Sequence, residues 1–228
     1  MRIALFVTCV NDLLHPSTGK AVVQVLHRLG HEVEFPLAQT CCGQMHANSG
    51  HPKQATPLAR NFAEVFRGFD AVVAPSGSCV AMVRDQYPHL GVTPPPVYEL
   101  SELLIDVLGV TDVGARFPHR VTYHPTCHGL RLLRLGDKPL RLLRRVREIE
   151  LIELPGAEEC CGFGGTFSVK NPDVSAAMLA DKCTAIRATN AQFLAAADNS
   201  CLTHLGGGLS RGRAHVTPIH YAEILAAH

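Results

Sequence analysis

Apolar segments of strand length alternate with longer amphipathic segments along the whole chain. In the amphipathic segments, apolar side chains recur at the spacing of a helical face, as Val22, Val25, Leu26 and Leu29 do. Strands that alternate with helices predict parallel sheets joined by right-handed crossovers. The strand candidates are residues 2–7, 32–35, 70–74, 120–123, 150–154 and 193–197, and the helix candidates are residues 19–29, 53–69 and 173–188.

Eight of the nine cysteines fall into two copies of one pattern. In the first copy 31 residues separate the first cysteine from an adjacent pair, and 36 residues separate the pair from the last cysteine. In the second copy the intervals are 32 and 39 residues, and matching positions are offset by 118 to 122 residues. The copies are Cys9, Cys41, Cys42 and Cys79, and Cys127, Cys160, Cys161 and Cys201.

This repeat predicts two homologous halves, residues 1–113 and 114–228. We expect an α/β fold in which two Rossmann-like halves with mostly parallel sheets are related by pseudo-twofold symmetry. A hydrophobic content of 46% suits a well-buried core. No segment approaches the roughly 18 to 20 apolar residues of a membrane span, and the apolar start is too short for a signal peptide. We therefore expect a cytoplasmic protein that does not span a membrane.

The predicted topology brings the cysteines of each half together. Sites in open parallel sheets form at the carboxyl ends of the strands, and Cys9 and Cys127 directly follow the first strand candidate of their halves. A helix N-terminus favours the thiolate form of a cysteine. Suitable N-cap residues stand just before Cys79 and Cys201, namely Ser76 or Ser78 and Asp198 or Ser200.

The spacing of the cysteines bears on what they bind. In a reducing cytosol, cysteines at fixed spacing are more often ligands or redox thiols than structural disulfides. Zinc sites usually use pairs with two to four residues between them, and neither half contains C-x-x-C. Adjacent cysteines suit a larger cluster, because neighbouring thiolates reach different irons, and a [4Fe–4S] cluster takes four thiolates. Three interpretations stay open from the residues: iron–sulfur clusters, a metal-free thiol–disulfide redox protein, and a zinc-stabilised assembly module.

Longer motifs surround these cysteines. They are residues 5–9, residues 41–44 (Cys-Cys-Gly-Gln), residues 75–79 (Pro-Ser-Gly-Ser-Cys) and residues 160–170, which begin Cys-Cys-Gly-Phe-Gly-Gly-Thr-Phe-Ser. Together they resemble the cysteine-rich CCG domain family, which includes a component of heterodisulfide reductase and the iron–sulfur subunit of glycolate oxidase. Over its full length the chain is most similar to the members of this family that serve lactate utilization.

The resemblance implies an iron–sulfur electron-transfer subunit that acts with two further subunits in the oxidation of L-lactate to pyruvate. It implies up to two clusters, held by the eight repeated cysteines, in a non-hydride oxidoreductase that needs its partners. Whether lactate reaches this subunit directly or only a partner is left open. An electron carrier needs no general base, so no residue is assigned a catalytic role.

One departure from the family pattern narrows the expected cluster. The fuller pattern ends in C-x-x-C, and this chain has Met82 and His204 in place of the final cysteine. A cluster with four cysteines per half is therefore expected instead of one with five. His124 and His128 bracket Cys127 closely enough to contact a bound cofactor or substrate, and His204 is a candidate for the same role.

Other classes of function lack their sequence signals. The glycines at 162–165 and 206–208 do not have the G-x-G-x-x-G spacing of a dinucleotide site. A basic stretch at 131–147 lacks interleaved aromatic residues, and the net charge of the chain is only +1, so we expect no nucleic-acid partner. The ninth cysteine, Cys183, lies within a helix candidate without a counterpart in the first half, which is typical of a core residue.

Overall fold

A computed structural model describes residues 1–228 of the chain. Its contacts divide the chain into two compact units, Met1–Val110 and Thr111–His228. Each unit contains one four-stranded sheet whose strands are all parallel. This architecture confirms the predicted α/β class with two Rossmann-like halves. No helix in either unit has the length and apolar character that crossing a membrane requires.

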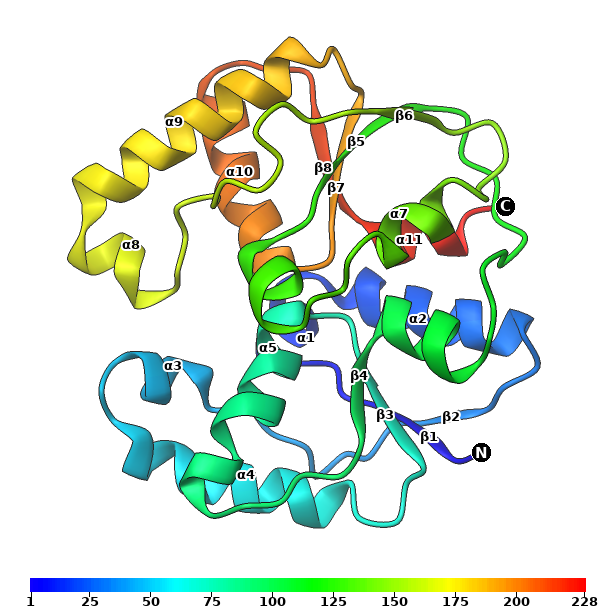
Figure 1. The fold of residues 1–228 in the computed structure, drawn as a ribbon, viewed down its shortest axis with the longest axis vertical. Helices are drawn as coiled ribbons and strands as arrows, with labels where there is room; N and C mark the ends of the chain where they lie inside the picture. Colours follow the sequence, from blue (N-terminus) through cyan, green and yellow to red (C-terminus); the bar gives the residue numbers. More distant parts are fainter. The chain divides into compact units, whose positions relative to one another are not determined.

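The first unit runs from blue to green in Figure 1. Short π-helical and 3-10 turns (labelled η) follow several of its α-helices. Its elements are β1 (Ile3–Leu5), α1 (Cys9–Leu14), α2 (Pro16–Arg28), β2 (Val33–Glu34), α3 (Gln44–Asn48), α4 (Pro52–Val65), β3 (Ala71–Ala74), α5 (Gly77–Ala81), η1 (Met82–Gln86), η2 (Pro88–Leu90), β4 (Val97–Glu99), α6 (Leu100–Glu102) and η3 (Leu103–Val107).

The second unit repeats the alternation of strands and helices, with a shorter helix before its second strand and longer helices on either side of its third. Its π-helical turn η4 begins directly after a cysteine, as α1 begins at one in the first unit. Its elements are β5 (Arg120–His124), η4 (His128–Leu132), α7 (Lys138–Leu143), β6 (Glu150–Ile152), α8 (Thr166–Lys170), α9 (Pro172–Ala188), β7 (Phe193–Ala196), α10 (Asn199–Arg211), β8 (Thr217–His220) and α11 (Tyr221–Ala226).

The strand order creates one switch point in each sheet. The orders are β2-β1-β3-β4 and β6-β5-β7-β8. The chain moves from β1 outward to β2 and then crosses back to β3, so the direction of winding reverses between β1 and β3. The same reversal occurs between β5 and β7. Ligands of open α/β sheets bind at the carboxyl ends of the strands at such a point.

The reversal also decides which face of the sheet each helix covers. Because crossovers are right-handed, helices on either side of the switch point pack on opposite faces. Figure 1 shows α2 and α4 on opposite sides of the first sheet. In the second unit it shows α9 and α10 on one side and α7 and α11 on the other. Both faces of each sheet are therefore covered, which explains why β3 and β7 are almost entirely buried.

Aromatic rings fill the first core on the face that α4 covers. Phe6 contacts Phe62 edge-on with ring centroids 5.0 Å apart, and Phe62 contacts Phe66 at 4.6 Å and Tyr87 at 5.6 Å. Leucine, isoleucine and alanine side chains dominate the corresponding core of the second unit, where Leu194, Ile186 and Leu205 are completely buried.

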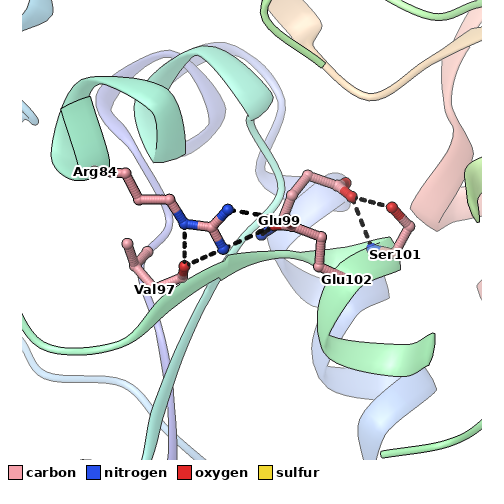
Figure 2. A network of polar contacts seen from close by, with 5 residues as sticks. All are labelled: Arg84, Val97, Glu99, Ser101 and Glu102. Carbon is pink, nitrogen blue, oxygen red and sulfur yellow. Dashed lines mark hydrogen bonds and ion pairs between the residues drawn. The ribbon is translucent and has the colours of Figure 1, made fainter. Parts of the chain in front are cut away.

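A polar network fastens the last strand of the first sheet to the turn before it (Figure 2). The guanidinium of Arg84 donates to both carboxylate oxygens of Glu102, each at 2.9 Å, and to the Val97 carbonyl. The Glu102 carboxylate accepts from the backbone N–H of Glu99, and the Glu99 carboxylate accepts from the backbone N–H of Ser101. This capping box starts α6 directly after β4.

Candidate metal centres

The four repeated cysteines of the first unit gather at the carboxyl end of its sheet. Cys9 begins α1 after β1, the pair Cys41-Cys42 precedes α3 after β2, and Cys79 lies in α5 after β3. The Sγ atoms of Cys9 and Cys41 are 3.5 Å apart, and those of Cys42 and Cys79 are 3.3 Å apart. Cys9 and Cys79 thus flank the switch point between β1 and β3.

The second unit repeats this cluster with its own strands. The Sγ atoms of Cys161 and Cys201 lie 3.3 Å apart, and the thiol of Cys127 donates a hydrogen bond to Cys160. In each unit the second cysteine of the pair and the last cysteine are buried, whereas the others are partly or fully exposed. Each cluster therefore extends from the core to the surface of its unit.

Strained backbone holds the first cysteine of each cluster. Thr8 has φ 60° and ψ 147°, and Thr126 also has φ 60°. A β-branched residue rarely adopts positive φ, and such strain costs about 1–3 kcal/mol and clusters at functional sites. In both units the strain lies one residue before the cysteine, where the chain must turn sharply off the strand to aim the thiol at the other three.

A glycine with positive φ follows each cysteine pair, with φ 82° at Gly43 and 88° at Gly162. This conformation turns the backbone N–H back toward the preceding thiols. The N–H of Gly43 lies 3.5 Å from the Cys41 sulfur, and that of Gly162 lies 3.4 Å from the Cys160 sulfur. A side chain has no room at Gly162, because an added Cβ would approach the Ser175 carbonyl oxygen to 2.7 Å.

Both predicted caps precede the last cysteine of their cluster. The Ser76 hydroxyl accepts from the backbone N–H of Cys79 at 3.3 Å, and the Asp198 carboxylate accepts from the N–H of Ser200 at 3.1 Å. Of the candidates named from the sequence, Ser76 and Asp198 are the residues that cap. These caps fix the start of α5 and α10 and place Cys79 and Cys201 in the first turn of a helix.

One thiol in each cluster is held as a thiolate. Hydrogen bonds from Cys42 and Cys9 lower the pKa of Cys41 to about 2, and hydrogen bonds from Cys127 and Cys161 do the same for Cys160. The donating thiols have raised pKa values, because they give their protons to that thiolate and lie in partly buried positions. Thiolates are the form in which cysteine ligates metals and attacks disulfides.

The donor set fits a soft metal group. All nine cysteines are free thiols. Four sulfurs at the edge of each sheet match the number that a [4Fe–4S] cluster requires, and thiolates are the ligands that select such clusters or zinc.

A profile of the cysteine-rich CCG domain matches residues 3–84 and 121–206. Each matched stretch begins in the first strand of a unit and ends a few residues after the last cysteine of its cluster. The chain belongs to the cysteine-rich CCG domain family. This membership confirms the resemblance that the cysteine motifs indicated.

Curated relatives match the chain from end to end. Lactate utilization protein A of Oceanobacillus iheyensis is 44% identical over 239 residues, covering 100% of this chain and 98% of that protein. Lactate utilization protein A of Geobacillus kaustophilus is 45% identical, with 100% and 99% covered. Among solved structures, a putative Asp/Glu racemase from Yersinia pestis covers 99% of this chain and 96% of that chain at 12% identity, with a TM-score of 0.39, a likeness too weak to inform on function.

The structure separates the three candidate histidines. His124 ends β5 and is buried beside Cys161 and Cys201. The Nδ1 atom of His128 lies 3.6 Å from the Cys127 sulfur, at the exposed side of the cluster. His204 lies in α10 with its ring 5.6 Å from that of Phe163. Only His124 lies between buried thiols.

Two further positions from the sequence analysis lie in the core. Met82 is buried at the start of η1, and Cys183 is buried in α9, where its thiol faces the Leu205 carbonyl at 3.8 Å.

Sequence reasoning missed a lysine beside the second cluster. Lys182 is completely buried in α9, and its ammonium donates to the Gly156 carbonyl. Burial lowers its pKa, whereas Glu159 and the thiols of Cys161 and Cys160 raise it. The buried residues of α9 are Ser175, Lys182, Cys183 and Ile186, a mixed set without an apolar stripe, so the sequence pattern did not reveal that this lysine is buried.

Proposed function

We propose that the chain is an iron–sulfur redox subunit that serves the oxidation of L-lactate to pyruvate. One observation carries the proposal: in each unit four thiols that follow three different strands gather at the carboxyl end of the sheet. The Sγ–Sγ distances are 3.5 and 3.3 Å in the first unit and 3.3 Å between Cys161 and Cys201 in the second. The proposed ligands are Cys9, Cys41, Cys42 and Cys79 in the first unit, and Cys127, Cys160, Cys161 and Cys201 in the second.

The chain holds and shields the proposed clusters. A bound [4Fe–4S] cluster takes up and releases single electrons. The buried thiols of Cys42, Cys79, Cys161 and Cys201 exclude water on the inner side. Cys9 is exposed, so the outer side of the first site is open to an electron donor or acceptor. No hydride cofactor is needed for this role, since partner proteins deliver and remove the electrons.

The relatives' name supports the substrate and the partners. Lactate utilization protein A matches the whole chain at 44–45% identity. We infer that this chain works in the cytoplasm with two further lactate utilization subunits, and that lactate is oxidised in that assembly.

Anaerobic purification followed by iron, sulfide and zinc quantification tests the proposal. Two buried cysteines give a matched pair of variants, since Cys42 is 2% exposed and Cys183 is 3% exposed. Cys42→Ser should lower the iron and sulfide content of the first site, and Cys183→Ser should leave both unchanged. Protein without iron and sulfide after anaerobic reconstitution would contradict the proposal, and stoichiometric zinc in their place would favour an assembly module.

A metal-free thiol–disulfide role is the second candidate. It is favoured by the short sulfur–sulfur distances and by the thiolates at Cys41 and Cys160, which are suited to attack a disulfide. Iron-free protein that cycles between dithiol and disulfide, with electrons passed to an external dithiol, would support it. Cluster-loaded protein with no such cycling would exclude it.

A further inference from the structure

The two units differ at one strand position beside the thiols. In the first sheet Ile3 lies opposite Ala71, and in the second Val121 lies opposite Phe193. Counting three residues along each strand from these matched pairs aligns Phe6 with His124. An aromatic core residue of the first unit is thus replaced by an imidazole in the second.

A second replacement accompanies the first. A Cβ on Gly43 would meet Ala55 in α4, and a Cβ on Gly162 would meet Ser175 in α9. Seven residues further along each helix, on the same face, stand Phe62 and Lys182.

The replaced residues are in contact in the first unit, and they interact electrostatically in the second. In the first unit the rings of Phe6 and Phe62 are in edge-on contact at 5.0 Å. In the second unit burial lowers the pKa of His124 to about 4, and the positive charge of Lys182 adds to this effect. An apolar aromatic pair in the first unit has therefore become a polar pair in the second.

His124 has the features of a ligand. It is 1% exposed, and neither ring nitrogen makes a hydrogen bond of normal geometry, although the Ala157 carbonyl is close. Leaving such atoms unsatisfied in a core is destabilising. A ring nitrogen and the Sγ atoms of Cys161 and Cys201 all lie within 4.8 Å of one another. A neutral imidazole offers the lone pair of one ring nitrogen to a metal.

We propose that His124 takes the place of one of the four thiolates as a ligand to the metal group of the second unit, which makes the second site a mixed nitrogen–sulfur site and the first an all-sulfur site. This inference rests on the proposed function. Coordination by the neutral ring uses its existing lone pair, so neither a proton nor an electron has to be supplied. Histidine in place of thiolate raises the potential of iron–sulfur centres, and the positive charge of Lys182 acts in the same direction. We therefore expect the second site to have the higher reduction potential.

Isotope labelling tests the proposal without any change at the second site. The first sample is the full chain with Cys41→Ser and Cys42→Ser, which removes the first site. It is produced with nitrogen-15 histidine and reconstituted anaerobically with iron and sulfide. The reduced protein is then examined by pulsed EPR. A directly bonded imidazole should give a strong histidine nitrogen-15 coupling. The converse variant, Cys160→Ser with Cys161→Ser, should give none. Mössbauer spectroscopy of iron-57 protein should show an iron with a nitrogen ligand in the first sample only.

Single histidine variants then assign the coupling. In the background without the first site, His124→Phe, which installs the residue of the first unit, should abolish the nitrogen coupling and lower the reduction potential of the remaining site. His204→Phe and His128→Phe should keep the coupling. Iron-loaded protein without histidine coupling, or coupling that survives in His124→Phe, would overturn the inference and leave the proposed function standing. If neither the variant without the first site nor the variant without the second site retains iron and sulfide, both this inference and the proposed function are refuted.

Discussion

Replacing Gly162 by alanine should destabilise the second unit because of both backbone conformation and steric overlap. The residue has φ 88°, and an added Cβ would lie 2.7 Å from the Ser175 carbonyl oxygen and 3.0 Å from the Cβ of Met178. Both atoms belong to α9, which also carries the buried Ile186 and Cys183, so the helix cannot move aside without disturbing the core.

The size of the effect follows from these two causes. A left-handed conformation costs a residue with a Cβ about 1–2 kcal/mol, and overpacking of a tightly filled site adds about 1–3 kcal/mol. Gly162→Ala should therefore lower the free energy of unfolding of the second unit by about 2–5 kcal/mol. Gly136 provides the matched control, since its φ is 61° and nothing lies within 4 Å of an added Cβ. Gly136→Ala should lower the free energy of unfolding only by the cost of the left-handed backbone conformation, about 1–2 kcal/mol.

Hydrogen exchange of the reduced, metal-free protein measures this loss in the second unit alone. Peptides from β7 and α9 exchange through unfolding of the core, so their protection reports the free energy of unfolding of that unit. The difference between the two variants should be about 1–3 kcal/mol. Equal losses in Gly162→Ala and Gly136→Ala would refute the steric argument, because only the backbone conformation would then matter.

Three further results are expected. Arg84→Met should lower the free energy of unfolding in urea by about 2–4 kcal/mol, because it leaves the buried carboxylate of Glu102 without its ion-pair partner. Arg116→Met breaks an exposed ion pair and should lower it by less than about 1 kcal/mol. Equal losses would contradict the role of burial. The pKa of Cys160 is lowered to about 2, so iodoacetamide should modify this thiol in metal-free protein at similar rates from about pH 5 to about pH 8. Cys183 is buried and has a raised pKa, so it should stay unmodified. Peptide mass spectrometry measures both rates, and a Cys160 rate that falls with acidification would argue against a thiolate. Thr8→Gly should leave the urea midpoint unchanged or raise it, because strain at φ 60° is relieved, and a clear fall would mean that the threonine side chain stabilises the turn.

Much of the fold was predictable because its elements carry strong local patterns. The buried runs that became β3 and β7 are continuous and apolar, as strands covered on both faces must be. The edge strand β8 was missed because Pro218 interrupts its pattern, and such a residue is tolerated only where a strand has a free side. The edge strand β4 was missed because it has only three residues, Val97–Glu99, and follows three prolines.

The candidate sites were predictable as far as the cysteines alone could indicate them. Their positions after predicted strands were enough to expect convergence, since strand ends meet at one edge of a parallel sheet. The special position of His124 was not predictable, because the absence of hydrogen-bond partners is a property of the packed core. The electrostatic effect of Lys182 on His124 depends on the face of α9 that meets the sheet, and the sequence does not determine that face by itself.

The dispersal of the thiols over the ends of three strands has a consequence for biosynthesis. In the unfolded chain the cysteines of one cluster are separated by intervals of 31 to 39 residues, apart from the adjacent pair. Such a chain has little affinity for a four-thiol group, so loading must follow folding, and a bound group stabilises only the folded state. All four thiols of the first unit lie within Met1–Val110. Every thiol of the first site is therefore synthesised before any residue of the second unit.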